Sequence, residues 1–113
     1  MALQAVAFPI APGKTEEWRK FIGELDGARH ADYVASRKGM GVRERAFLQA
    51  TPMGDLVIVT LEGDSPGEAF GRFVTSSDPF ARWFVETVNE LHGIDIAQAS
   101  AGPMPELVLD SSR

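Results

Sequence analysis

Three side chains between positions 28 and 38 have the spacing of a single helix face. Arg37 follows Tyr33 by four residues, and His30 precedes Tyr33 by three. An imidazole, a phenol and a guanidinium on one face can protonate or orient a bound substrate. The alternative is a solvent-facing helix whose Tyr33 is half-buried against a sheet, because no partner for the three is evident on another segment.

Two arginines and a glutamate form a second candidate group on two predicted neighbouring strands. If Ala50 pairs with Asp55 across the turn, the register is fixed along both strands. Arg43 then lies opposite Glu62, and Arg45 lies one diagonal step away. A charge on an otherwise apolar sheet is costly unless it is paired. Arg45 is therefore either an anchor for an anionic or carbonyl-bearing ligand, or part of a structural Arg–Glu pair at the sheet end or at a dimer interface.

His92 is the remaining candidate catalytic residue. It comes at the predicted end of a helix, where the helix dipole favours a cation. The structural alternative is a capping role before Gly93, with a hydrogen bond to Asp95.

Four aromatic residues could line a hydrophobic ligand pocket together with His30. Each can bury roughly 150–250 Å², so core packing is their default role, and no spacing in the sequence separates the two roles. The four are Trp18, Phe80, Trp83 and Phe84.

Composition excludes several classes of chemistry. None of the 113 residues is cysteine, which rules out disulfides, thiolate nucleophiles and cysteine-based metal sites. The two histidines are far apart, and no phosphate-binding glycine pattern or nucleophile elbow occurs, so we expect no metal and no cofactor. The formal charge of −5 and the scattered basic residues argue against nucleic acid. No signal peptide or membrane span is evident, so we expect a cytoplasmic protein that does not bind membranes.

Hydrophobic periodicity predicts the elements of the first half of the chain. We expect a strand over residues 3–10, a helix capped by Thr15, and a second helical piece over residues 28–38. Strands over residues 42–51 and 55–63 follow, joined by a hairpin turn.

The second half predicts helices and one more strand. A capping box at Ser65 begins a helical region, and Asp78 caps a restarted helix that ends at Gly93. A loop over residues 94–105 then leads to a last strand over residues 106–109.

This order of elements predicts one domain over residues 1–113, of the α+β class. It is typical of a ferredoxin-like βαββαβ fold, with a four-stranded antiparallel sheet and helices on one face. The predicted strands are apolar on both faces, whereas the helices can cover only one. We therefore expect a homodimer that buries the other face of the sheet.

Four pieces of the chain resemble a branch of a known superfamily. They are residues 44–49 (ERAFLQ), 51–56 (TPMGDL), 78–84 (DPFARWF) and 92–95 (HGID). With the βαββαβ order, these pieces are similar to the dimeric α/β-barrel superfamily, which includes antibiotic-biosynthesis monooxygenase-like, stress-responsive barrel and haem-degrading families. The resemblance implies a dimeric α/β barrel with a cavity between sheet and helices in each subunit, and it brings no established activity.

The resemblance implies two kinds of ligand. Cofactor-independent monooxygenases of the superfamily bind planar substrates against aromatic side chains, a role that Trp18 or Trp83 beside Tyr33 would have here. Haem-degrading members use a histidine near the end of the second helix, a tryptophan earlier on that helix and an asparagine on the first strand. Trp83 and His92 match two of these in placement, but the first strand has Gln4 and no asparagine.

The leading hypothesis is a small homodimer that binds a small, largely apolar organic molecule. Monooxygenase-like chemistry would then depend on Tyr33, Arg37, Arg45 and His92. The alternatives are a non-catalytic binding or structural protein whose aromatic residues are all core, and haem binding. An enclosed pocket of roughly a few hundred Å³ that touches one of those polar groups would favour the first hypothesis, and a filled interior would favour a structural role.

Overall fold

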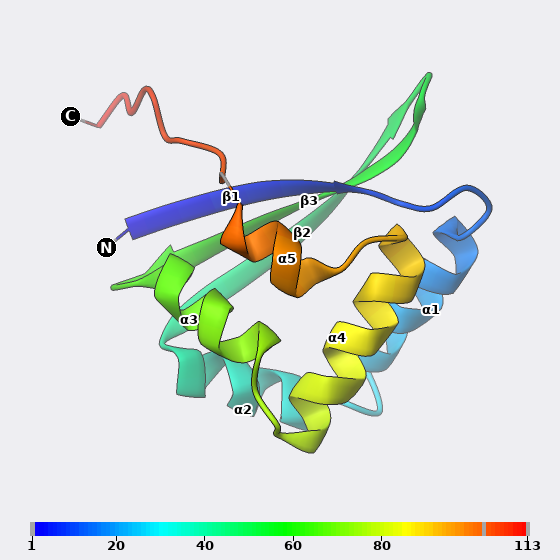
Figure 1. Cartoon of the computed structure of the whole chain (residues 1–113), viewed down its shortest axis with the longest axis horizontal. Helices are drawn as coiled ribbons and strands as arrows, with labels where there is room; N and C mark the ends of the chain where they lie inside the picture. The colour runs from blue at the N-terminus through cyan, green and yellow to red at the C-terminus, as the bar shows by residue number, and fades with distance from the viewer. Residues whose placement is uncertain (1, 103, 113) are drawn as a thin grey trace.

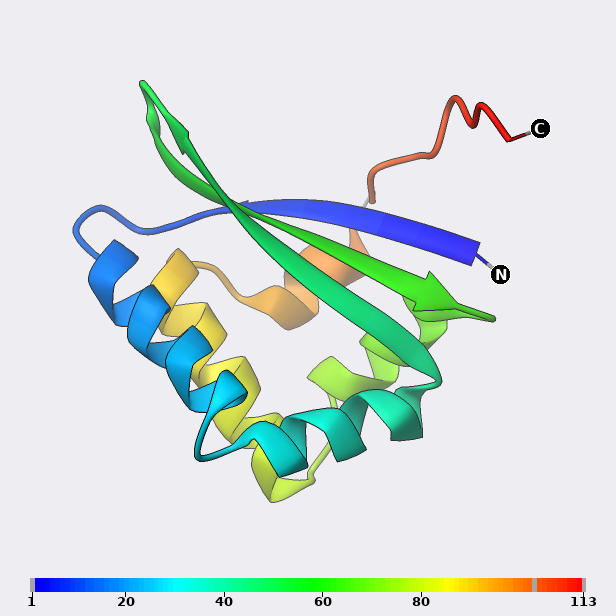
Figure 2. The same cartoon turned by 180° about the vertical axis from the view of Figure 1, so that it is seen from behind.

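The fold was analysed in a computed structural model, which describes residues 2–102 and 104–112. One antiparallel sheet of three strands packs against five helices, all on the same face of the sheet (Figures 1 and 2). The α+β class is therefore as predicted. In chain order the elements are β1 (Ala2–Pro9), α1 (Thr15–Asp26), α2 (His30–Met40), β2 (Val42–Thr51), β3 (Gly54–Gly63), α3 (Pro66–Val74), α4 (Pro79–His92) and α5 (Ile96–Ala101).

The sheet has the order β1-β3-β2, with β3 in the centre. The predicted register of the β2–β3 hairpin is confirmed, since Ala50 pairs with Asp55 and Arg43 with Glu62. The Thr51 hydroxyl donates to the carbonyl of Gly54 at 2.6 Å and accepts from the backbone N–H of Met53 at 3.1 Å, which closes the turn. Turn chemistry and side-chain alternation therefore fix this register together.

Helix capping follows the sequence in α4 but not in α1 or α3. The Asp78 carboxylate accepts from the backbone N–H of Ala81 at 3.1 Å, as predicted. Thr15 is the first residue of α1 and not its cap, and its hydroxyl donates to Asp55 Oδ2 at 2.7 Å. Ser65 precedes α3 but makes no capping hydrogen bond with its side chain. The Thr15 prediction is wrong because a carboxylate on β3 offers its hydroxyl a charged acceptor.

The predicted fourth strand is not formed, so the four-stranded ferredoxin-like sheet and the barrel built on it are wrong for this chain. Residues 106–109 pair with no strand in the described part of the chain, and β1 remains an edge strand. Part of the predicted loop before them is α5, which the side chain of Asp95 caps through the N–H of Ala97 at 3.1 Å. After α5 the chain leaves the body on the helix-free side of the sheet (Figure 1).

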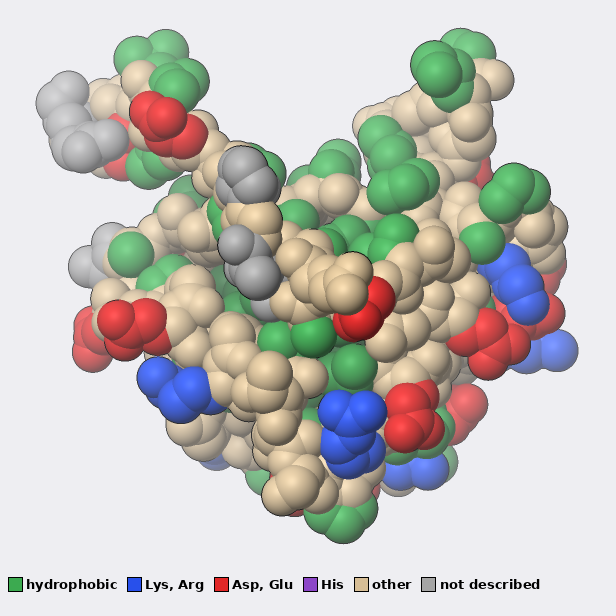
Figure 3. All heavy atoms as spheres, in the orientation of Figure 1, with side chains coloured by type: hydrophobic (Ala, Val, Ile, Leu, Met, Phe, Trp, Pro, Cys, Tyr) green, Lys and Arg blue, Asp and Glu red, His purple; other side chains and the backbone are tan. Residues whose placement is uncertain are grey.

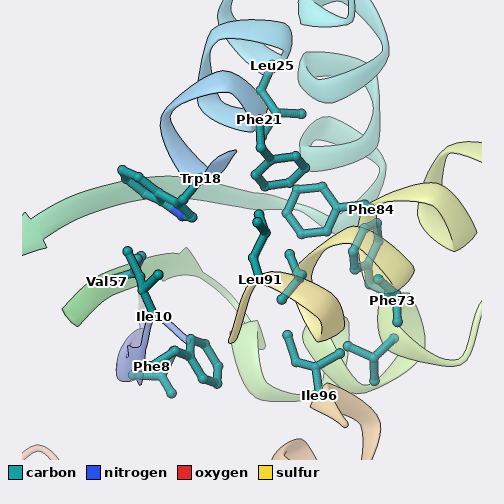
Figure 4. Close-up of a cluster of buried hydrophobic side chains, with 14 of the residues drawn as sticks. Phe8, Ile10, Trp18, Phe21, Leu25, Val57, Phe73, Phe84, Leu91 and Ile96 are labelled. Atoms are coloured by element: carbon teal, nitrogen blue, oxygen red, sulfur yellow. The ribbon is translucent and has the colours of Figure 1, made fainter. Parts of the chain in front are cut away.

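The hydrophobic core lies between the helices and the sheet. Phe84 is at its centre, with ring contacts to Phe21 at 5.2 Å and Phe73 at 5.3 Å (Figure 4). The opposite face of the sheet has no helix over it and leaves Leu3 and Phe47 exposed. Among the described residues, no helix has the length and apolar character that crossing a membrane requires.

Candidate ligand cavity

A small cavity of about 60 Å³ lies between the sheet and the helices. Its walls are mostly apolar, with Val6 and Phe8 from β1 and Trp18 from α1 among them. Four polar side chains also reach it from α2, β2 and α4. They are Tyr33, Arg37, Glu44 and His92.

Glu44 holds two of these polar side chains. The Tyr33 hydroxyl and Arg37 Nε each donate to Glu44 Oε1 at 2.7 Å. The chain reverses between α2 and β2 at Gly41, whose φ of +69° is in the left-handed region, and this reversal brings Glu44 back beside α2. The side chains of Arg37 and Glu44 are only 8% and 11% exposed, so the pair is buried rather than a surface salt bridge.

Aromatic rings surround the guanidinium of Arg37. Its central carbon lies 4.6 Å from the ring centre of Phe73 and 4.7 Å from that of Phe84. Burial, followed by the negative charge of Glu44 and the hydrogen bond to it, raises the pKa of Tyr33 well above its ordinary value. The Tyr33 phenol therefore stays protonated and donates to Glu44.

His92 presents a different kind of polar group to the cavity. Its Nδ1 lies 2.7 Å from the carbonyl oxygen of Pro9, which can only accept, so Nδ1 carries a proton. Burial lowers the pKa of His92 below its ordinary 6.5, despite this hydrogen bond. The imidazole is therefore neutral at pH 7, and Nε2 has a free lone pair. The predicted bond to Asp95 is wrong, because Asp95 caps α5 instead.

Arg45 lies outside the cavity. It points from the helix-free face of the sheet, where its guanidinium contacts Glu62 Oε1 at 3.2 Å. This is the diagonal pair that the register predicted, and it corresponds to the structural alternative for these residues. Arg43 is exposed on the same face.

The predicted pocket residues divide into two groups. Trp18 and Phe84 line the cavity. His30 is exposed, with Nδ1 3.1 Å from the carbonyl oxygen of Leu25, and Phe80 lines an open groove between α2, α3 and α4. Trp83 is half-buried beneath the guanidinium of Arg29, 3.9 Å from its ring centre.

Glu44 lines the cavity but was not among the residues predicted from the sequence. In the predicted register it falls on the same face as Ala46 and Leu48, so a charge on the apolar face was visible in the alternation. The residues predicted from these strands were the two flanking arginines, Arg43 and Arg45, which lie on the other face of the sheet.

A larger hollow of about 400 Å³ lies beside β1, next to α3 and α5. We call it the outer hollow. Its lining is apolar and shares Val6, Phe8 and Phe70 with the inner cavity. The other lining residues are Ala7, Pro9, Ile94, Ala99, Met104 and Pro105.

Haem does not fit the inner cavity. Pockets for drug-sized or cofactor-sized molecules measure roughly 300–1,000 Å³, well above the 60 Å³ beside His92. The described residues also contain no group of three or more histidine or carboxylate side chains that could hold a metal ion.

Comparison with known proteins adds no relative to this picture. No family model, curated protein or solved structure matches the chain.

Proposed function

We propose that the protein binds a small, largely apolar organic molecule with a hydroxyl group in the cavity between the sheet and the helices. The observation that carries the proposal is that His92 lines a mostly apolar cavity and that its Nε2 lone pair has no hydrogen-bond partner among the described residues. A hydroxyl donor satisfies this lone pair, while the rest of the ligand contacts apolar walls.

The volume of the cavity limits the ligand. A water molecule needs about 10–15 Å³ measured in this way, and an engineered cavity that holds benzene measures about 150 Å³. A cavity of about 60 Å³ therefore accepts a molecule of about two or three non-hydrogen atoms, such as ethanol. The polar groups expected around a ligand are present, whereas the enclosed volume is smaller than expected from the sequence.

The contacts of the polar residues favour binding over monooxygenase-like catalysis. Tyr33 and Arg37 both donate to Glu44, and Arg45 is on the opposite face of the sheet. Among the described residues that line the cavity, His92 and Glu44 can accept a proton from a ligand, and the charge of Glu44 is already held by Tyr33 and Arg37.

The proposal can be tested with two isomers, ethanol and dimethyl ether, of which only the alcohol has an O–H donor. Trp18 lines the cavity, so its fluorescence and amide shifts in NMR spectra report binding. We expect the alcohol to bind about 2–10 times more tightly than the ether, which is the value of one hydrogen bond, and His92→Phe to remove the difference.

The preference for the alcohol should also depend on pH. It should persist at pH 6.5 and disappear in more acidic solution, because the pKa of His92 lies below 6.5 and protonation removes the acceptor. If neither isomer binds at millimolar concentrations, the cavity is structural.

We also propose that a second copy of the chain covers the helix-free face of the sheet. This face carries Leu3, Phe47 and Ile58 beside the ion pair of Arg45 with Glu62. Both signs of charge lie on one face, so two copies related by a two-fold axis can place each arginine near a glutamate of the other.

The last residues support the same dimer. Residues 105–109, which we call the C-terminal arm, leave the body on this side, as does the tip of the β2–β3 hairpin, and both carry exposed hydrophobic side chains (Figure 3). Val108 and Leu109 are 82% and 83% exposed. The sheet face alone has a footprint of roughly 440 Å², from about 3.3 Å per residue and 4.8 Å per strand, against about 800 Å² per partner in a stable complex. The arm therefore has to contribute to the interface.

A further inference from the structure

Phe70 borders both the inner cavity and the outer hollow. Both spaces are lined by Phe70 on α3 and by Val6 and Phe8 on β1. The inner cavity contains the polar groups but measures only about 60 Å³, whereas the outer hollow measures about 400 Å³ and is lined by apolar residues. Joined, the two spaces fall within the roughly 300–1,000 Å³ of ligand pockets.

Of the three shared residues, Phe70 is the one whose side chain is least constrained by its contacts. Val6 and Phe8 are buried in the core on a strand that pairs along its whole length with β3, and the ring of Phe8 lies 5.5 Å from that of His92. Phe70 is only half-buried and makes no ring contact with the described part of the chain, in contrast to Phe73, which packs on Phe84. Its side chain can therefore turn aside without breaking an aromatic cluster.

The helix that carries Phe70 is poorly stabilised by its own sequence. It has nine residues and contains Gly67 and Gly71. A Cβ atom at either glycine would meet nothing within 4 Å, so packing does not require glycine at these positions. Glycine is the poorest helix former after proline, which makes this helix easier to distort than its neighbours.

We infer that Phe70 is a gate, and that its movement joins the two hollows into one channel for an elongated apolar molecule with a terminal hydroxyl. The inference rests on the proposed function, since the hydroxyl is placed at His92 in the inner cavity. None of the described residues that line the outer hollow is charged, so the tail of the ligand is a hydrocarbon chain. A medium-chain primary alcohol such as octan-1-ol has this chemistry.

The test compares octan-1-ol with ethanol in the wild-type protein and in Phe70→Ala. A closed gate reduces the apparent affinity for any ligand that needs it open, and removal of the ring removes this penalty. We expect Phe70→Ala to bind octan-1-ol five to ten times more tightly than the wild type. Because Phe70 also lines the inner cavity, the readout is the ratio of octan-1-ol affinity to ethanol affinity, which should rise in the variant. Phe47→Ala is the control, because Phe47 is an exposed phenylalanine on the opposite face of the sheet and should change neither affinity.

Two results would overturn the gate. One is octan-1-ol binding no more tightly than ethanol in the wild type, and the other is equal octan-1-ol affinity in Phe70→Ala and Phe47→Ala. In either case ethanol binding still supports the proposed function, whereas loss of binding by both alcohols contradicts the function itself. Phe70→Leu provides the same comparison if the alanine variant does not fold.

Discussion

Glu44 is the residue on which the polar part of the cavity depends. Its carboxylate is the acceptor for both Tyr33 and Arg37, and it is the negative charge that balances a guanidinium packed among aromatic rings. The pair also holds the Arg37 guanidinium at Glu44, whereas the spacing of His30, Tyr33 and Arg37 predicted that it could orient a bound substrate. Glu44 was not identified from sequence because the contact joins two segments whose packing only the fold reveals.

Substitution of Glu44 should be much more costly than substitution of the glutamate on the other face. Glu44→Gln leaves the buried charge of Arg37 uncompensated, and we expect a loss of about 3–5 kcal/mol in the free energy of unfolding. Glu62→Gln removes the exposed partner of Arg45 and should cost less than about 1 kcal/mol. Urea denaturation of both variants measures the difference. Similar losses for the two would show that the Arg37–Glu44 pair is not buried in solution.

At the scale of elements, the two predicted caps that precede α3 and α4 behave differently. Asp78 accepts from the N–H of Ala81, whereas Ser65 makes no capping bond. We therefore expect Asp78→Ala to reduce the free energy of unfolding by about 1 kcal/mol. Ser65→Ala should change it by only a few tenths of a kcal/mol, since there is no bond to lose. Thermal or chemical unfolding of the pair measures this, and an equal loss in both variants would contradict the assignment of the caps.

Local patterns predicted the elements well, and contacts between distant segments were the part that they missed. The register of β2 and β3 followed from alternation and from a turn sequence, both of which are local. The last strand was inferred from a short apolar run, which shows that a segment can be extended but not that it has a partner. The helix α5 was missed because its start depends on the side chains of Asn89 and Asp95, which accept from the N–H groups of Ile96 and Ala97 at 2.8 and 3.1 Å.

At the scale of the whole molecule, the proposed dimer assigns a role to the C-terminal arm and to the open face of the sheet. A charge at a buried position of a dimer interface has no partner and weakens association strongly. We expect Phe47→Glu on the face and Val108→Glu on the arm each to weaken dimerisation at least tenfold, measured by sedimentation over a range of concentrations. Ala31→Glu, at an exposed position of α2 on the helical side, should have no effect. A wild-type protein that stays monomeric at tens of micromolar would contradict the dimer, and a normal dimer in Val108→Glu would remove the arm from it.

The pairing of the first strand with the third has a consequence for biosynthesis. Pro9 lies opposite Leu56 and Ala2 opposite Gly63, so β1 must close a loop of nearly half the chain before it gains any hydrogen bond. The β2–β3 hairpin closes over two residues and can form at once. On the ribosome, the strand that is made first is therefore the last to join the sheet, and its apolar residues stay available to chaperones until the hairpin has left the exit tunnel.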